Sequence, residues 1–148
     1  MAQSVLTNEE IRLFMMDKTE LNPLILGVRW SAEAIDAAMT NVVDYFNVMN
    51  PPSSQKYTVE SFPYRYLMLM GSAGYLLKSA AINEAANQLS YAADGVQIND
   101  KDKAQIFISM GTEYWNEFKE AAHDIKLNQN IAEVYGTKHS EYIHRRRW

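Results

Sequence analysis

Residues Phe62–Ser90 have the sequence FPYRYLMLMGSAGYLLKSAAINEAANQLS, and this stretch decides the fold of the chain. Over Tyr66–Leu77 it is apolar on every face of a helix, whereas a surface helix shows a single apolar stripe. Pro63 suits a first helical turn, with Ser61 or Phe62 as the N-cap. The apolar run is much shorter than the roughly 20 residues that cross a bilayer. The sequence therefore predicts a buried central helix that the other helices surround.

Two glycines lie inside this predicted helix, Gly71 and Gly74. Glycine in a helix interior costs about 1 kcal/mol relative to alanine. That cost predicts that a second backbone approaches the helix closely at these positions. A local kink in the helix is the alternative explanation.

A first helix is predicted to begin at Thr7 and to end near Asp17. Thr7 and Glu10 have the spacing of a capping box, in which each residue satisfies a backbone donor of the other. One apolar face then follows at helical spacing, with Ile11, Phe14 and Met15. The sequence predicts that this short helix is stable only when that face is packed.

Residues 18–30 are predicted to be a connector, interrupted by Pro23 and Gly27, whose apolar side chains fill the core: Leu24, Ile25, Leu26 and Trp30. Ser31 is a suitable N-cap for a second helix. The apolar positions of this helix step by four and three residues: Ile35, Met39, Val42, Phe46 and Met49. Two prolines at 51 and 52 end the helix, and a polar loop over 51–61, extended at 57–59, is expected to follow.

The last predicted helix pairs with the central one. Asp94 and Gly95 predict a turn, Val96 and Ile98 a short extended piece, and Asn99 or Asp100 an N-cap. A heptad seam follows, formed by Ala104, Ile108, Gly111, Trp115, Phe118, Ala122 and Ile125, and widened by Phe107, Tyr114 and Ala121. Because only a turn separates the two long helices, the sequence predicts an antiparallel pair.

Composition and charge bound the class of protein. With 148 residues, 47% of them hydrophobic, the chain predicts one globular domain. It has no cysteine, which excludes disulfides and thiolate metal sites. Its N-terminal residues lack the pattern of a secretory signal, so we expect synthesis and retention in the cytosol, with no membrane association. Residues 138–148 carry +3 and the rest of the chain −7, which together give the net charge of −4.

Catalytic and cofactor signatures are missing from the sequence. The three histidines, His123, His139 and His144, have no partner at metal-binding spacing, and there is no glycine-rich phosphate loop or G-x-S-x-G motif. Glu113 and Glu117 lie one turn apart, but on the polar face of a predicted helix, where a solvated face explains them. We therefore expect a protein that is not an enzyme and that binds no cofactor or metal.

The C-terminal residues lose helical periodicity from about residue 128. We interpret residues 1–130 as a helical domain and residues 131–148 as an extended C-terminal arm. An alternative is that Ile131, Val134 and Tyr135 complete the last helix. The basic end, Arg145–Trp148, has three guanidinium groups, which can bind phosphates or the carboxylates of an acidic protein surface. Its last residue is a tryptophan, a type enriched at the centre of protein interfaces.

Several of these features coincide with a known pattern. They are SFPYRYLMLMGSAGYLLKSAAINEAANQLSYAADGVQINDKDKAQIF (61–107), the aromatic-rich helix that follows, and VYGTKHSEY (134–142). Together they resemble the neck proteins of tailed bacteriophages, the head-to-tail connector or adaptor family. The resemblance covers roughly residues 62–142. The run of three arginines before the final tryptophan has no counterpart in that pattern.

The resemblance implies a structural function in the virion neck, after assembly in the host cytoplasm. A ring, commonly of twelve copies, would continue the DNA channel without sequence-specific binding and would contact the portal protein and other neck or tail proteins. The portal-binding residues would be those of the arm: Ile131, Val134, Tyr135, Tyr142, Ile143, Arg145, Arg146, Arg147 and Trp148. The alternative is a small nucleic-acid-binding or regulatory helical module that uses the basic tail. In either case we expect an all-α fold, four helices in a bundle-like domain with two long antiparallel helices and an extended C-terminal tail.

Overall fold

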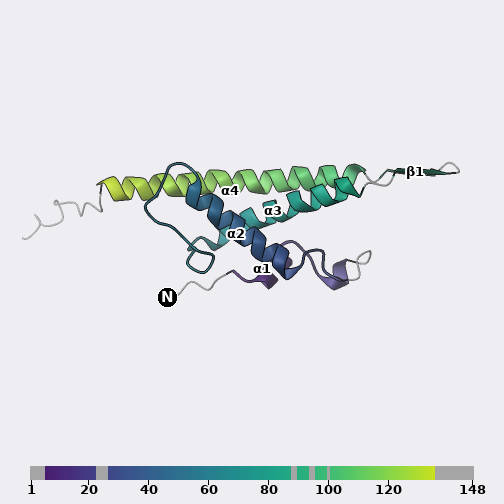
Figure 1. Cartoon of the computed structure of the whole chain (residues 1–148), viewed down its shortest axis with the longest axis horizontal. Helices are drawn as coiled ribbons and strands as arrows, with labels where there is room; N and C mark the ends of the chain where they lie inside the picture. Colours follow the sequence, from purple (N-terminus) through teal and green to yellow (C-terminus); the bar gives the residue numbers. More distant parts are fainter. Residues whose placement is uncertain (1–5, 23–26, 88–89, 94–95, 100, 136–148) are drawn as a thin grey trace, which may run out of the picture.

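A computed structural model of the chain describes residues 6–22, 27–87, 90–93, 96–99 and 101–135. Within these ranges the fold is helical, as predicted, with one short hairpin (Figure 1). The elements are α1 (Asn8–Phe14), a 3-10 turn (Thr19–Leu21), α2 (Ala32–Val48), α3 (Arg65–Ala86), β1 (Ser90–Ala93), β2 (Val96–Asn99) and α4 (Lys101–Tyr135). Helix α4 spans most of the molecule, and α2 crosses the α3–α4 pair obliquely.

The capping box that opens α1 is confirmed. The Thr7 side chain accepts a hydrogen bond from the backbone N–H of Glu10, and the Glu10 carboxylate accepts one from the backbone N–H of Thr7 at 2.8 Å. The helix ends at Phe14, earlier than predicted, because Met16 adopts a φ of 53°, which helices do not permit.

A buried carboxylate, that of Asp17, organises the connector after α1. It accepts hydrogen bonds from the side chains of Arg12 and Asn22 and from the backbone N–H groups of Arg29 and Trp30, at 2.7–3.2 Å. Four donors compensate the burial of this charge. The connector is therefore held by a polar centre; the predicted core residues Leu24, Ile25 and Leu26 lie outside the described residues.

Helix α2 agrees with its prediction. Ser31 caps it by accepting a hydrogen bond from the backbone N–H of Ala34 at 3.2 Å. The predicted stripe faces the core: Ile35, Met39, Val42 and Phe46 are buried, and Met49 packs against them. The following loop has no strand over residues 57–59 and contains instead a turn at 59–61.

Helix α3 begins at Arg65 with Tyr64 at its N-cap, two residues after the predicted first turn at Pro63. The reason is aromatic packing: Phe62 is buried edge-on against Phe46, with ring centroids 5.1 Å apart, and also contacts Tyr57. Phe62 and Tyr64 lie before the helix, where their rings pack into this cluster.

Helix α3 is also less enclosed than its sequence predicts. Leu67, Met68, Leu76 and Leu77 are buried, but Tyr66 is 64% exposed and Leu69 only partly buried. The hydroxyl of Tyr66 donates a hydrogen bond to Glu117 of α4 at the surface. One side of α3 therefore faces solvent, and the prediction that protein surrounds it on every face is wrong.

Gly74 brings the backbones of α3 and α4 together, as predicted, whereas Gly71 is packed against side chains and not against a second backbone. A Cβ atom on Gly74 would lie 2.9 Å from the backbone N of Trp115 and 3.1 Å from the carbonyl oxygen of Gly111. A Cβ atom on Gly71 would meet the side chains of Val42 and Phe118. Gly71 therefore lies near Phe118, and Gly74 lies near Trp115 and Gly111. Because higher residue numbers on α3 meet lower residue numbers on α4, the two helices are antiparallel.

The segment between α3 and α4 is a hairpin, where the sequence predicted a turn and a single extended piece. Strands β1 and β2 pair antiparallel, with Ser90 opposite Asn99 and Ala93 opposite Val96. The heptad seam of α4 is mostly confirmed, since Ala104, Gly111, Phe118 and Ala122 are buried. The exceptions are Ile108, which is 47% exposed, and Ala121, which is also exposed.

Candidate partner-binding surface

Three of the predicted arm residues belong to α4, which continues to Tyr135. The predicted boundary between residues 130 and 131 therefore falls inside a helix, and residues 131–135 are not extended. The alternative, that Ile131, Val134 and Tyr135 complete the helix, is the correct one. The remaining predicted arm residues lie outside the described residues: Tyr142, Ile143, Arg145, Arg146, Arg147 and Trp148.

The loop between α2 and α3 fastens these last turns of α4 to the bundle. Ser54 donates a hydrogen bond to the carboxylate of Glu133 at 2.8 Å. Gln129 donates to the hydroxyl groups of both Tyr57 and Tyr64, at 3.1 and 2.9 Å. Because both tyrosines belong to the aromatic cluster around Phe46, the end of α4 is anchored to the core.

Lys126 is a fully buried cation in the same region. Its ammonium group donates a hydrogen bond to the carbonyl oxygen of Met49, the C-cap of α2, at 2.7 Å. It also lies 5.2 Å from the ring centroid of Phe46. The C-terminal end of a helix carries a partial negative charge, so a cation there stabilises α2. Lys126 thus joins α4 to the end of α2.

The buried position lowers the pKa of Lys126, first through desolvation and then through repulsion from Lys56. Because its pKa is lower in the folded than in the unfolded chain, the unfolded chain binds more protons than the folded chain as the pH rises from neutral toward 10.5, the ordinary pKa of lysine. The folded state consequently gains stability over that interval.

We therefore expect the native chain to gain stability relative to a Lys126→Met variant between pH 7 and pH 10. Methionine keeps the apolar stem over Phe46 but has no proton to lose, so the comparison cancels the other titrating groups. Urea unfolding of both proteins at the two pH values measures this difference. A difference that stays constant, or that shifts in favour of the variant, would contradict the burial of a charged amine.

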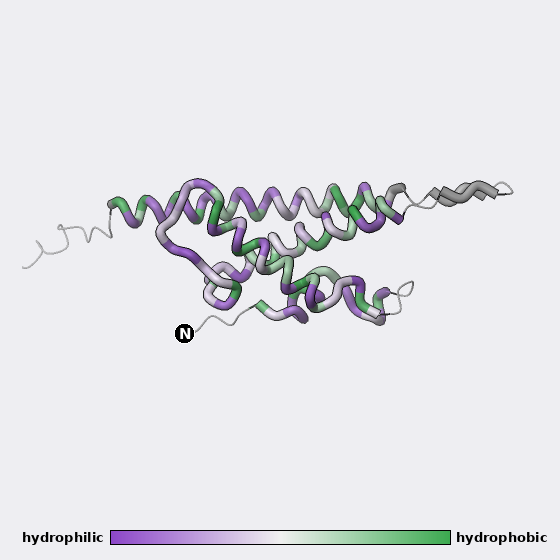
Figure 2. Tube along the Cα trace, viewed as in Figure 1, coloured by the Kyte–Doolittle hydropathy of each residue, from purple (hydrophilic) through white to green (hydrophobic). Residues whose placement is uncertain are grey.

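A row of residues on the outer side of α4 lies opposite its buried seam. Its members follow the seam residues by two positions, which on a helix is about 200° of rotation. They recur at heptad spacing: Glu113, Glu117, Glu120, Asp124, Leu127, Ile131 and Val134. We call this set the outer row. Its first four residues are acidic and its last three apolar, and hydrophobic residues recur in the last turns of α4 in Figure 2.

The apolar end of the outer row is open to solvent. Leu127 is 40% exposed, Ile131 54% and Val134 76%, with exposure increasing toward the end of the helix. Scattered exposed apolar residues need no explanation, but a continuous helical stripe is typical of a binding surface. Their offset of about 200° from the seam is a signal that the sequence contains, and Ile131 and Val134 were predicted as partner-binding residues, whereas Leu127 was not.

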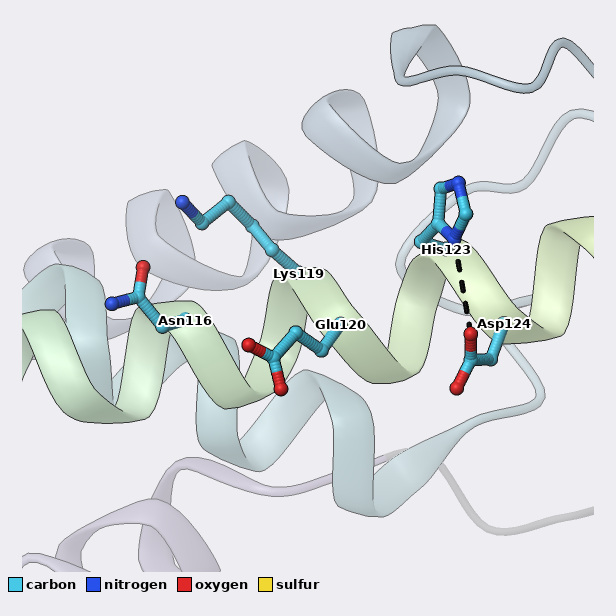
Figure 3. A pocket seen from close by; sticks show the side chains of 5 residues that line it. All are labelled: Asn116, Lys119, Glu120, His123 and Asp124. Atoms are coloured by element: carbon cyan, nitrogen blue, oxygen red, sulfur yellow. Dashed lines mark ion pairs between the residues drawn. The ribbon is translucent and has the colours of Figure 1, made fainter.

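An open groove of about 410 Å³ lies along the acidic end of the outer row (Figure 3). Its lining residues all come from α4: Asn116, Lys119, Glu120, His123 and Asp124. The side chains of Glu120 and Asp124 lie along the helix, and His123 lies 3.8 Å from Asp124. The groove is a solvated helix face lined by two carboxylates, one lysine, one histidine and one asparagine.

A second pocket, of about 320 Å³, lies between the end of α1, α3 and α4. Methionine and aromatic side chains dominate its wall, including Met15, Trp30, Phe107 and Tyr114. Arg29 closes one side: its guanidinium lies 5.0 Å from the ring centroid of Phe107 and forms an ion pair with Glu84 at 3.0 Å. The two charged side chains named here, Arg29 and Glu84, are thus paired with each other.

Among the described residues, no group of three or more histidine, aspartate or glutamate side chains is placed to hold a metal ion. None of the described helices is both long and apolar enough to span a membrane.

The chain was compared with protein-family models, with curated proteins and with solved structures, and no match was found in any of the three comparisons.

Proposed function

We propose that this chain is a structural protein of the neck of a tailed bacteriophage. Copies of it would form a ring, commonly of twelve, that joins the portal to the tail and continues the DNA channel. The proposal begins from the sequence pattern of residues 62–142. The observation that supports it best is α4, a helix of 35 residues, about 52 Å long, that reaches past the end of α2 and leads directly into residues 136–148.

The arm is the proposed contact with the portal protein. Ile131 and Val134 present apolar side chains at the end of α4, and Tyr142, Ile143, Arg145–Arg147 and Trp148 follow in sequence. Aromatic residues and arginine are the types most often found at the centre of protein interfaces. In this proposal α4 serves as a rigid stem, and the residues beyond it attach the ring to the portal above.

The charge of the helical body suits a channel through which DNA passes without being bound. Outside residues 138–148 the chain carries −7. Acidic surfaces repel phosphates, so the DNA moves through and is not held by sequence-specific contacts. The same charge makes copies of the chain repel one another.

Because of that repulsion, we expect the isolated protein to be a monomer or weak oligomer that closes into a ring only on a portal template. Exposed residues along α2 include polar ones, such as Thr40, Asn41 and Asp44, beside the apolar Tyr45 and Val48, so its apolar area is interrupted. Sedimentation at micromolar concentration, with and without portal protein, tests this expectation. A stable ring without portal would show that the template is unnecessary, and failure to bind portal at all would contradict the proposed function.

The alternative is a small nucleic-acid-binding or regulatory module that uses its basic tail. The run Arg145–Arg147 is the feature that favours it, because guanidinium groups match phosphate geometry. In that case, replacing the three arginines by alanine should reduce the salt dependence of DNA binding by roughly one unit of slope per lost phosphate contact. A chain that binds DNA without any salt dependence would exclude this alternative.

A further inference from the structure

The outer row of α4 contacts α3 at Glu117, which accepts a hydrogen bond from the Tyr66 hydroxyl, but its apolar end is open to solvent. Its apolar end, Leu127, Ile131 and Val134, is 40–76% exposed, although the opposite side of the same turns is fastened to the bundle through Lys126 and Gln129. A helix surface that faced only water would continue the acidic pattern set by Glu120 and Asp124. The change from acidic to apolar along one row indicates a binding segment that has a basic part and an apolar part.

The C-terminal residues of the chain have those two parts in the complementary order. Tyr142 and Ile143 come first, then Arg145–Arg147, and Trp148 is last. A segment that turned back after α4 would run antiparallel to it. It would first meet the apolar end of the outer row and then the acidic end, so apolar residues would meet apolar ones and arginines would meet carboxylates.

The length of the segment also fits. If residues 136–140 form the connection, a common length between packed elements, eight residues remain, 141–148. In extended form they cover about 26 Å, at roughly 3.3 Å per residue. On a helix, that distance corresponds to about 17 residues at 1.5 Å each. Counted back from Val134, this reaches Glu117, within the acidic part of the row.

We propose that residues 141–148 dock on the outer row of their own α4 and cover it while the protein is free. Tyr142 and Ile143 pack on Ile131 and Val134, and the arginines pair with Asp124 and Glu120 along the groove of Figure 3. Lys119 and His123 flank this groove and keep the arginines on its acidic side. The short tether gives the tail a high effective concentration at its own helix, which favours this site over a second copy.

While it is docked, the tail is not available to bind a partner. It hides the exposed apolar residues of α4 from other copies, and a partner that binds the tail must first displace it from the row. This inference concerns the free protein and does not rest on the identity of that partner, so it stands or fails separately from the proposed function.

Engineered cysteine pairs test the docking, because the chain has no cysteine of its own. Ile131→Cys, in the outer row, and Ala132→Cys, also exposed but about 100° further round the helix, form a matched pair. Each is combined with Tyr142→Cys or with Ile143→Cys and oxidised in dilute full-length protein. For at least one tail position we expect the intramolecular disulfide to form about tenfold or more faster in the Ile131→Cys variant than in the Ala132→Cys variant.

Equal rates at the two helix positions, with both tail cysteines, would overturn the proposal. Disulfide-linked dimers in place of intramolecular bonds would overturn it too, since the tail would then dock on a second copy. The contact between the arginines and the acidic residues has its own test. With Glu120→Gln and Asp124→Asn added, the disulfide should form at the same rate in the Ile131→Cys and Ala132→Cys variants. The control, Glu33→Gln with Asp44→Asn on the exposed side of α2, should leave the difference intact, and an unchanged difference in the first variant would overturn the proposed direction of the tail.

Discussion

Leu76→Asp is expected to unfold the protein. Leu76 is 1% exposed in the middle of α3, packed within the core cluster. An aspartate there loses the apolar burial and places an unpaired carboxylate among apolar groups, at a cost of several kcal/mol. Domains of this size are stable by only about 5–15 kcal/mol. Circular dichroism should show loss of the cooperative melt, or a fall of the midpoint by well over ten degrees.

Two other positions on α3 complete this experiment. Ile82 is 71% exposed, so Ile82→Asp should change stability by only about 0.5 kcal/mol. Leu69 is partly buried, and Leu69→Asp should fall between the two, although the sequence alone predicts the same damage as at Leu76. A Leu76→Asp variant that melts within a few degrees of the native chain would contradict the placement of this helix in the core.

A chain that ends at Tyr135 should keep its fold and lose its attachment to the portal. The last described helical residue is Tyr135, and Glu133, which holds the loop through Ser54, is retained. The deleted residues include the aromatic and arginine anchors of the proposed arm. Anchors of this kind cost about 2 kcal/mol or more each when removed, so their joint loss should weaken attachment by several powers of ten.

The two readouts are the melting temperature and the particles assembled in an infection that depends on the truncated protein. We expect a cooperative melt, lowered only by the contribution of the docked tail, and DNA-filled heads without tails. A chain that ends at Asn130 is the comparison, because it also removes the Ser54–Glu133 hydrogen bond and should melt lower. Truncation at Tyr135 that still joins heads to tails would contradict the connector-arm proposal.

The local sequence determined where most helices begin and what kind of fold they build. Thr7 with Glu10, and Ser31, place two N-termini correctly because a cap depends only on neighbouring residues. The heptad seam of α4 and the glycines at 71 and 74 predicted the close antiparallel pair. The spacing of apolar residues and the free-energy cost of glycine in a helix interior both follow from the amino-acid sequence, so they can be inferred without the tertiary structure.

Only the tertiary structure decided how far the cover of each long helix extends, around α3 and along α4. The sequence placed Ile131 and Val134 in an extended arm, and that they continue α4 with exposed side chains became clear only in the structure. Likewise, Lys126 is a surface residue by type, yet it is buried because the C-cap carbonyl of α2 lies beside it. Burial depends on partners that are distant in sequence, and a local pattern carries no information about where those partners end.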